Sequence, residues 1–370
     1  MSAGLSHFTR RGVLSLTGGA LIGRFVCGGT AHDILATKPV SPESDKADFD
    51  ELVRPFADRR EFTGTVLVSS GDRVLFEKAY GYADLEWDIP NTVDAKFRIG
   101  SISKQFTAAS VLLLAQDRKL DLDQSVTKYI PNAPDAWRPI TIHNLLTHTS
   151  GIPDFLGFPG FQAAKTLPSS PHETLLRFRD RPLEFAPGTE GRYSNSGYVA
   201  LTCIVENVSG VSFSPFLTDR LFRPLGLNDT GTDTCRVILW HRARGYTHFR
   251  AGLGNADYID MSIATGGGSL YSTVGDLRRW TLALHHNRVV GPNLYRRMTT
   301  PTFHNYGYGL EIRNGPDGRI IDHGGGMEGF SSFLQYRELR QLVVAVLANL
   351  NTDIAGRLAN QLADQALRGG

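Results

Sequence analysis

Residues 97–104 read Phe-Arg-Ile-Gly-Ser-Ile-Ser-Lys, and a largely apolar stretch follows at 106–114. In a helix, the spacing from Ser101 to Lys104 places the serine hydroxyl and the lysine amine on one face. Gly100 allows a tight turn just before this helix, and the N–H groups of a helix start favour developing negative charge. A desolvated lysine can lose its proton and accept the serine proton. This geometry would suit a serine nucleophile with Lys104 as its proton partner, although the Ser-x-x-Lys spacing by itself is a weak signal in a chain of this length.

The Ser-x-x-Lys spacing occurs a second time, in Ser125-Val126-Thr127-Lys128. Pro131 follows shortly after this copy and would end a helix there. The second copy is therefore interpreted as a surface turn, and the first copy is the candidate for chemistry.

Two further motifs carry groups that suit acyl transfer. Tyr193-Ser194-Asn195 is the only Y-x-N in the chain, and His323-Gly324-Gly325-Gly326 contains the only H-x-G. A phenol can pass a proton, and an amide can hold a substrate amide or orient a lysine. Consecutive glycines let the backbone approach a ligand and leave N–H groups free for an oxyanion. Taken alone, the first motif is more typical of an ordinary loop, and the second is equally typical of a turn or β-bulge.

Strand patterns lie at both ends of the chain and helical patterns lie between them. A helical stretch at 48–56 precedes a hairpin of residues 62–69 and 73–80, which Ser70-Gly71-Asp72 joins. Later strands are predicted at 306–312, 319–321, 330–337 and 341–348, and a closing helix at 353–367. The fold class is therefore α/β (α+β), with an antiparallel sheet flanked by helices and an inserted, mostly helical domain. We expect a linker at 32–48, a sheet-and-helix domain from 49–100 together with 301–370, and a helical domain at 101–300.

The first 31 residues are typical of an export signal of the twin-arginine type. They contain no acid, the pair Arg10-Arg11 and a short apolar run, and small residues lead up to Ala31. A structural first helix is the alternative interpretation. Cys27 lies in a poor context for lipid attachment, so we expect a periplasmic or secreted protein rather than a lipoprotein. After removal of the export signal, Cys203 and Cys235 would remain, either as a disulfide pair or as two free thiols.

Composition and absent motifs exclude several classes of function. The chain has 370 residues with 39 basic and 37 acidic side chains, so no basic field for nucleic acid is expected. No uncharged apolar run approaches the ~20 residues that span a bilayer. No metal-binding, nucleotide-binding or G-x-S-x-G motif occurs, so we expect no metal and no cofactor. The expected partner is a small-molecule or peptide substrate, and the sequence does not indicate an oligomeric state.

In this order and spacing, the three motifs resemble those of the penicillin-recognising serine hydrolases. That superfamily includes class C β-lactamases, D-alanyl-D-alanine carboxypeptidases, D-aminopeptidases and family VIII-type esterases. The stretch Leu145-Leu146-Thr147-His148-Thr149-Ser150-Gly151, the glycines 266–268 and the pair Gly329-Phe330 are also similar to the superfamily. The resemblance covers nearly all of the chain after residue 31 and implies a β-lactamase/transpeptidase-like fold.

The resemblance also implies roles for individual residues. Ser101 would be acylated, while Lys104 and Tyr193 would share the proton transfers, with either one as the base. Asn195 would contact the substrate amide. The backbone N–H groups of Ser101 and Gly326 would form the oxyanion hole, and His323 and Gly325 would line the substrate site.

One departure concerns the third motif, where class C β-lactamases have Lys-Thr-Gly and this chain has His323-Gly324-Gly325. A histidine is mostly neutral at pH 7, so a fixed positive charge for a substrate carboxylate is missing. Arg319 could supply that charge from nearby in sequence. His148 is expected to hold a loop beside the site rather than to act as a base.

The expected function is therefore hydrolysis through an acyl-enzyme, acting on amide bonds of D-amino-acid peptides or β-lactams. Ester hydrolysis on the same scaffold is one alternative. A penicillin-binding sensor that is acylated without turnover is another.

Overall fold

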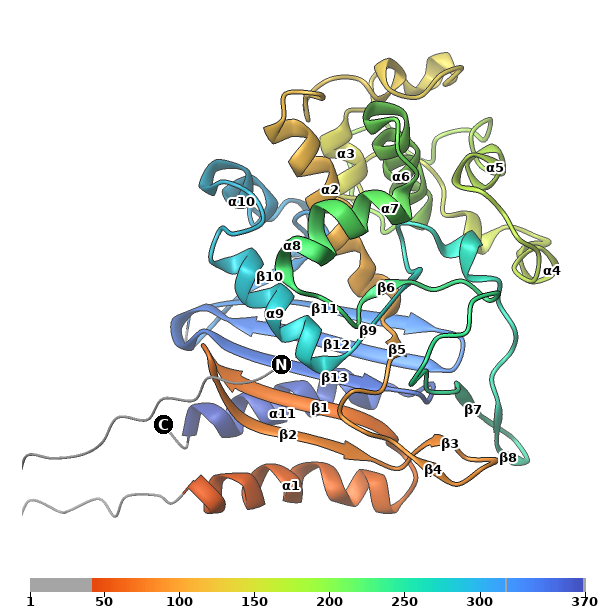
Figure 1. Cartoon of the computed structure of the whole chain (residues 1–370). Helices are drawn as coiled ribbons and strands as arrows, with labels where there is room; N and C mark the ends of the chain where they lie inside the picture. The colour runs from red at the N-terminus through yellow and green to blue at the C-terminus, as the bar shows by residue number, and fades with distance from the viewer. Residues whose placement is uncertain (1–41, 317, 369–370) are drawn as a thin grey trace, which may run out of the picture. The chain divides into compact units, whose positions relative to one another are not determined.

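The predicted hairpin forms the edge of the main sheet in the computed structural model, which describes residues 42–316 and 318–368 (Figure 1). It consists of β1 (Gly64–Ser70) and β2 (Arg73–Tyr80). Gly71, between the two strands, has a φ of +53°, which glycine adopts without steric cost.

Six antiparallel strands make up this sheet in the order β10-β11-β12-β13-β1-β2. The four strands from the carboxyl-terminal part of the chain are β10 (Glu311–Gly315), β11 (Gly318–Met327), β12 (Phe330–Arg337) and β13 (Leu342–Ala348). Strand β1 pairs with β13, with Val66 opposite Val346. The two ends of the chain therefore meet in one sheet, as the distribution of strand patterns predicted.

Helices cover both faces of the sheet, and the sequence of the central strand β13 is apolar throughout as a result. Every residue of β13 is buried. Val344 and Val346 face a core shared with α1 (Pro42–Asp58) and α11 (Ile354–Arg368). Their neighbours Val343 and Leu347 face the larger core, on the side where α9 (Val274–His285) contacts β13 and β1. A strand buried on both sides reads as a continuous apolar run because no position needs a polar residue.

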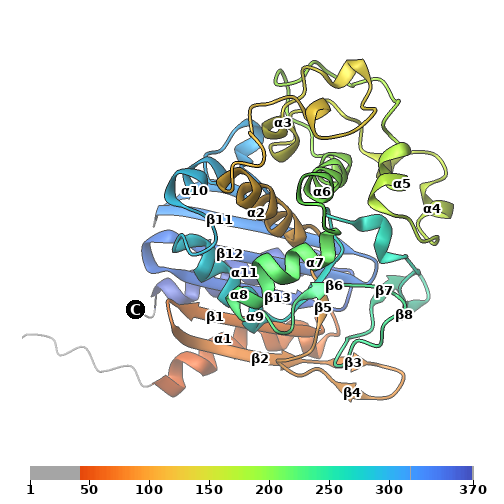
Figure 2. The ribbon, with the colours of Figure 1, turned by 45° about the horizontal axis from the view of Figure 1, so that its top comes forward.

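The helical layer above the sheet is built around α2 (Ser103–Gln116), which follows the 3₁₀ turn η1 (Gly100–Ile102). α2 contacts α6 (Asn195–Ser209) (Figure 2). Phe106 of α2 stacks on Trp280 of α9 with ring centroids 4.0 Å apart, and the Trp280 indole N–H donates to Gln105 Oε1 at 2.9 Å. These contacts hold the helix that carries Lys104 between the sheet and α6.

The remaining elements are short. The other strands are β3 (Tyr82–Asp84), β4 (Ile89–Pro90), β5 (Phe97–Arg98), β6 (Gly231–Thr232), β7 (Tyr246–Phe249), β8 (Gly252–Asn255) and β9 (Leu270–Ser272). The other α-helices are α3 (Ile142–Leu146), α4 (Phe161–Ala164), α5 (Pro171–Leu176), α7 (Phe213–Leu217), α8 (Arg223–Leu225) and α10 (Pro292–Met298). The 3₁₀ turns are η2 (Val126–Lys128), η3 (Asp135–Trp137), η4 (Phe155–Gly157), η6 (Met261–Ala264), η7 (Phe303–Asn305) and η8 (Glu338–Arg340), and η5 (Thr218–Phe222) is a π-helical turn.

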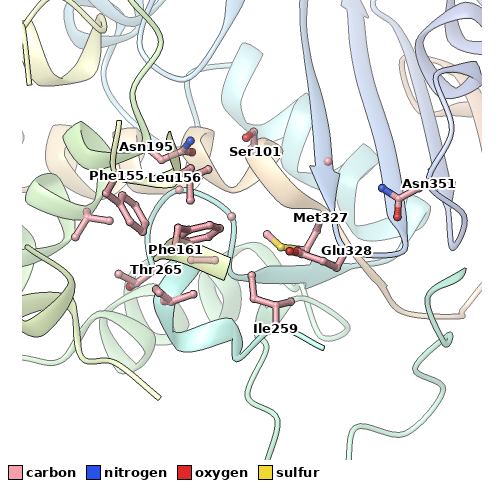
Figure 3. A pocket seen from close by; sticks show the side chains of 16 residues that line it. Ser101, Phe155, Leu156, Phe161, Asn195, Ile259, Thr265, Met327, Glu328 and Asn351 are labelled. Carbon is pink, nitrogen blue, oxygen red and sulfur yellow. The ribbon is translucent and has the colours of Figure 1, made fainter. Parts of the chain in front are cut away.

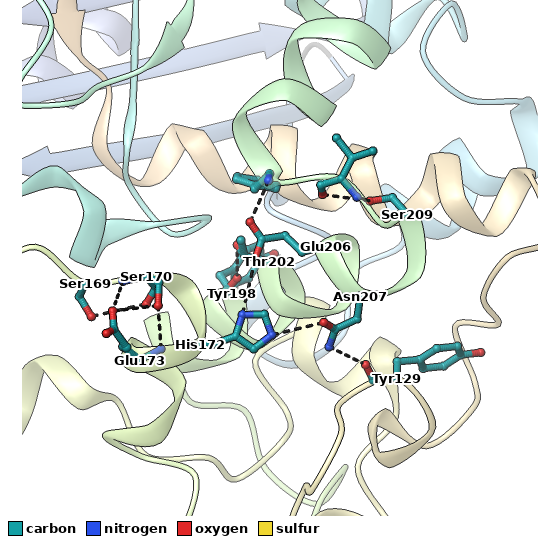
Figure 4. A network of polar contacts seen from close by, with 12 residues as sticks. Tyr129, Ser169, Ser170, His172, Glu173, Tyr198, Thr202, Glu206, Asn207 and Ser209 are labelled. Atoms are coloured by element: carbon teal, nitrogen blue, oxygen red, sulfur yellow. Dashed lines mark hydrogen bonds and ion pairs between the residues drawn. The ribbon is translucent and has the colours of Figure 1, made fainter.

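A polar network anchors the last turns of α6 (Figure 4). His172 of α5 lies 3.3 Å from Asn207 Oδ1, and the Asn207 amide nitrogen donates to the Tyr129 carbonyl at 3.0 Å. Ser170 caps α5 in a capping box with Glu173. This network fixes the carboxyl-terminal end of the helix whose first residue is Asn195.

The fold class is confirmed: an antiparallel sheet carries helices on both faces. Strand β12 matches the predicted 330–337, and α11 lies within one residue of the predicted 353–367. The strand predicted at 306–312 is wrong, because η7 precedes a single bridge between Tyr306 and Glu311 and β10 begins only at Glu311. His323 and its glycines do not form a turn before a strand but lie inside β11.

Several predictions concern segments or boundaries rather than single elements. α1 begins at Pro42, so residues 42–48 of the expected linker are helical instead. The export signal at 1–31 and residues 32–41 lie outside the described residues, and export stays a prediction. Residues 42–368 belong to one compact unit, and the division at 100 and 300 also stays a prediction.

In the described part of the chain, no single helix is long and apolar enough to cross a membrane. The helices Asn195–Ser209 and Phe213–Leu225 reach that length only as a pair bent by 78°.

Cys203 and Cys235 are both free thiols, which decides between the two alternatives left open by the sequence.

Candidate active site

Ser101 and Lys104 meet as their spacing predicted. The turn η1 places Ser101 at the entrance of α2, and Lys104 Nζ lies 3.0 Å from Ser101 Oγ. The same nitrogen donates to Asn195 Oδ1 at 2.8 Å and to the Gly267 carbonyl oxygen at 2.7 Å. Three oxygen atoms from three distant segments therefore surround one amine.

The environment of Lys104 makes its neutral form accessible. Its side chain is fully buried. Burial lowers the pKa of Lys104 from 10.5 to about 7, against the opposing effect of the Asp154 charge. Near neutral pH, Lys104 is therefore divided between an ammonium ion and an amine that can accept a proton.

Tyr193 and Asn195 lie on either side of the start of α6. Lys104 Nζ lies 4.8 Å from the centroid of the Tyr193 ring. Tyr193 as a whole residue is 41% exposed. Burial of its phenol raises the pKa of Tyr193, and the neighbouring Ser101 hydroxyl only partly opposes this rise. At neutral pH the phenol is therefore protonated and can donate.

Asp154 fixes the orientation of the Asn195 amide. Its Oδ2 accepts from Asn195 Nδ2 at 3.0 Å, and its Oδ1 accepts from the Asn195 backbone N–H at 3.2 Å. Oδ1 also accepts from the N–H of Leu156 at the start of η4. Asn195 is therefore held from both its backbone and its side chain, with Oδ1 turned toward Lys104.

His148 holds the backbone on both sides of Tyr193. Its ring Nδ1 accepts from the Ser194 N–H at 3.2 Å, and its carbonyl oxygen accepts from the Arg192 N–H at 2.9 Å. The imidazole packs on the Tyr193 ring with centroids 4.3 Å apart. His148 has a φ of +58°, an uncommon conformation for a non-glycine residue. It thus holds the loop that carries the phenol, as the sequence predicted.

The glycines of β11 pack backbone to backbone against η1. A Cβ atom on Gly100 would stand 2.7 Å from the Gly326 nitrogen, and one on Gly325 would stand 2.1 Å from the Ile99 carbonyl oxygen. Side chains at these positions would force the strand away from Ser101. Gly326 and Ser101 both line one cavity, and the close approach of Gly100 to Gly326 makes their backbones neighbours at its wall.

His323 is buried in β11 and does not line that cavity. Its Nδ1 donates to the Gly324 carbonyl oxygen, so Nε2 of the neutral ring accepts from the Tyr306 hydroxyl at 2.9 Å. Burial, and then the Lys104 charge, lower the pKa of His323 to about 4. Arg319 does not replace the missing charge, because it donates to the Thr299 carbonyl near the far end of β11. The third motif is therefore uncharged at neutral pH.

A cavity of about 370 Å³ opens in front of Ser101 (Figure 3). It is lined by Ser101, Phe155, Leu156, Phe161, Asn195, Val199, Ile259, Ile263, Ala264, Thr265, Gly267, Gly268, Gly326, Met327, Glu328 and Asn351. Phe155 and Phe161 are the aromatic side chains in its wall.

The family model described as Beta-lactamase matches residues 49–368. The chain belongs to the Beta-lactamase family. It is a serine hydrolase of the penicillin-recognising superfamily, which confirms the resemblance of its motifs.

Individual relatives of this β-lactamase family member support the same family assignment. It is 29% identical over 324 residues to Penicillin-binding protein 4* of Bacillus subtilis (strain 168), covering 82% of this chain and 71% of the relative. A penicillin binding protein from Bacillus halodurans matches with a TM-score of 0.76 and 26% identity, covering 86% of this chain and 98% of that one. D-amino acid amidase from Ochrobactrum anthropi SV3, complexed with L-phenylalanine, matches with a TM-score of 0.74 and 25% identity, covering 87% and 98%.

In this family member, the structure brings together Ser101, Lys104, Tyr193, Asn195 and Gly326, while His323 and Gly325 lie behind them. Sequence reasoning missed Asp154 and the Gly267 carbonyl. Asp154 follows the stretch at 145–151 that marks the family, but a single Pro-Asp pair indicates no function. A backbone carbonyl has no residue type to identify it, and only the glycines at 266–268 pointed toward that segment.

Proposed function

We propose that the chain hydrolyses its substrates through an acyl-enzyme on Ser101. The observation that carries this proposal is the buried Lys104 amine, 3.0 Å from Ser101 Oγ and with a pKa of about 7. A base with a pKa near the working pH transfers protons efficiently.

In the first half-reaction, Ser101 Oγ attacks the substrate carbonyl carbon while its proton passes to Lys104 Nζ. The N–H groups of Ser101 and Gly326 stabilise the oxyanion, each contributing about 2.7–4 kcal/mol to lowering the barrier. As the tetrahedral intermediate collapses, the leaving group takes a proton from the Tyr193 hydroxyl, which is resupplied from Lys104. The protonated phenol and the titrating amine favour Lys104 as the base and Tyr193 as the proton donor.

In the second half-reaction, a water molecule attacks the acyl carbon and gives its proton to Lys104. The same oxyanion groups serve this step. Ser101 recovers its proton as the acid product leaves, so the enzyme returns to its starting state.

The substrate class that the relatives support is the amide of a D-amino acid, including D,D-peptides and β-lactams. One relative is named for binding penicillin and another for D-amino acid amides. Ester hydrolysis is the second candidate, and the neutral third motif favours it because an ester need not carry a carboxylate. Asn195 would contact the substrate amide through the part of its side chain that lines the cavity.

The test uses the purified chain with a fluorescent penicillin, D-phenylalaninamide and p-nitrophenyl butyrate. We expect turnover of at least one substrate and a covalent adduct of one acyl group by intact mass. Ser101→Ala should abolish both. Ser125→Ala, in the second Ser-x-x-Lys stretch, is the matched control and should keep both. A Ser101→Ala protein that still turns over substrate would show that another nucleophile acts, and an adduct without any turnover would identify a sensor.

A further inference from the structure

The charges around the cavity restrict what it can bind. Within the described residues, Glu328 is the one charged side chain in the cavity wall. Its carboxylate already accepts from the buried Lys165 Nζ at 3.0 Å, and Lys165 is also 3.6 Å from Asp257. Lys104 lies behind Ser101, where its hydrogen bonds to Asn195 and Gly267 occupy it. A substrate carboxylate in this cavity would therefore meet an anion and no free cation.

The rest of the wall is largely apolar. Phe155, Leu156 and Phe161 extend into the cavity from the segment containing η4 and α4, and Ile259 and Met327 lie across from them (Figure 3). Removing an unpaired carboxylate from water into such surroundings is costly, whereas an aromatic or aliphatic group gains by the same transfer.

We propose that the site selects amides and esters that are apolar and carry no carboxylate beside the scissile bond. This inference rests on the proposed function and narrows it. β-Lactams and peptides that end in D-alanine carry a carboxylate on the leaving group, so they are the poorer members of the substrate class. Primary amides and esters of aromatic or aliphatic D-amino acids are the better ones.

A matched pair of substrates tests this selection. N-acetyl-D-phenylalanyl-D-alanine and its carboxyl-terminal amide share the same scissile bond and differ only in the carboxylate. We expect kcat/KM to be at least 10-fold higher for the amide. Met327→Lys, which adds a cation to the wall, should lower that ratio at least 5-fold. Glu328→Gln, which removes the anion, should also lower it.

The outcomes separate the two proposals. If the free acid is hydrolysed as fast as the amide by the unmodified chain, the selection is overturned. Loss of both reactions in Ser101→Ala would then still support the acyl-enzyme. If either reaction persists in Ser101→Ala, the proposed function itself fails.

A second inference concerns Asp154 and rests on hydrogen-bond donors and acceptors rather than on the cavity. A neutral lysine amine has two hydrogens and one lone pair. Asn195 Oδ1 and the Gly267 carbonyl oxygen can only accept, so they take both hydrogens at 2.8 and 2.7 Å. The lone pair is then left for the hydroxyl proton of Ser101, at an Nζ to Oγ distance of 3.0 Å.

This arrangement requires Asn195 to present its oxygen, not its amide nitrogen, to Lys104. A carboxylate has no hydrogen to donate, so Asp154 can pair only with Asn195 Nδ2. We infer that Asp154 is a positioning residue that aims the Lys104 lone pair at Ser101 by fixing the Asn195 amide.

The test is Asp154→Asn, which keeps the size of the side chain but can pair with either end of the Asn195 amide. We expect kcat to fall at least 10-fold with KM changed less than 3-fold. Because a negative charge that raises the pKa of Lys104 is removed, the acid limb of the kcat/KM profile should move to lower pH. This pH shift reports the lost charge, whereas the loss of kcat at nearly constant KM reports the lost orientation of the Asn195 amide.

A double-mutant cycle supplies the control. In an Asn195→Ala background the positioned amide is gone, so Asp154→Asn should no longer change kcat. Equal losses in both backgrounds would show that Asp154 acts only on local structure, and would overturn the inference. An unchanged kcat in the single variant would do the same, while retained thermal stability excludes simple unfolding.

Discussion

Replacing Gly100 with alanine tests whether the oxyanion site depends on the contact between η1 and β11. The new Cβ atom would lie 2.7 Å from both the nitrogen and the oxygen of Gly326, whereas ordinary contacts begin at 3.4 Å. The two backbones must therefore separate by about 0.7 Å. Such a displacement moves one N–H donor away from the oxyanion, and losing one donor costs about 10²–10³ in kcat. We expect kcat for p-nitrophenyl butyrate to fall about 100-fold.

The substitution also has a backbone cost that must be separated from the catalytic effect. Gly100 has a φ of +49°, and an alanine in this region costs roughly 1–2 kcal/mol of stability. Gly226→Ala is the matched control, because Gly226 has a φ of +65° and no atom within 4 Å of the added Cβ. Thermal unfolding followed by circular dichroism should show a loss of stability in both variants. Normal kcat in Gly100→Ala would refute the proposed oxyanion geometry, as would an equal loss of kcat in Gly226→Ala.

Further expectations follow from the same site. Because the ammonium form of Lys104 cannot accept a proton, kcat/KM should decline below a pH of about 7, and a pH-independent rate between 5 and 9 would contradict Lys104 as the base. Lys104→Met should abolish turnover, and its free energy of unfolding relative to that of the unmodified chain should be about 5 kcal/mol more favourable at pH 6 than above pH 10.5. That gain should shrink between pH 7 and 10.5, since over this range the unfolded lysine holds a proton that the folded one has lost; denaturant titrations at several pH values measure it. His148→Asn, which tolerates positive φ, should lower kcat about 10-fold as Tyr193 loses its packing and the Ser194 N–H loses its acceptor; unaltered steady-state kinetics would exclude this role.

The sequence predicted those parts of the site that depend on short-range geometry. Ser101 and Lys104 are one helical turn apart, so helix periodicity alone brings them together. Strand β12 was predicted at its observed limits because Phe330, Phe333 and Tyr336 give this short stretch a high strand propensity. The assignment of Tyr193 and Asn195 relied instead on the order of the motifs, since neither residue type identifies a site by itself.

Where the sequence predictions failed, tertiary contacts overrode the local conformational preference of the residues. Three consecutive glycines disfavour a strand, yet Gly324, Gly325 and Gly326 lie within β11. The strand is held by its pairing with β12, and it needs glycine where it approaches η1. Asp154 lies 41 residues from the Asn195 amide that it orients, a distance that no periodicity in the chain encodes.

The groups that surround Ser101 explain why glycine runs were nevertheless informative. The Gly267 carbonyl and the Gly326 N–H belong to segments far apart in the chain. The first accepts from the Lys104 amine and the second lies against the turn that carries Ser101, both as bare backbone. A Cβ atom on Gly267 would stand 3.3 Å from Asn195 Oδ1, in the space beside the lysine amine. A backbone N–H or carbonyl can reach a catalytic side chain only where no intervening side chain keeps the two chain segments apart. An active site that uses backbone groups therefore has glycine in each strand or loop that approaches it. The sequence therefore marks which segments converge, while the partners of each N–H and carbonyl follow only from the fold.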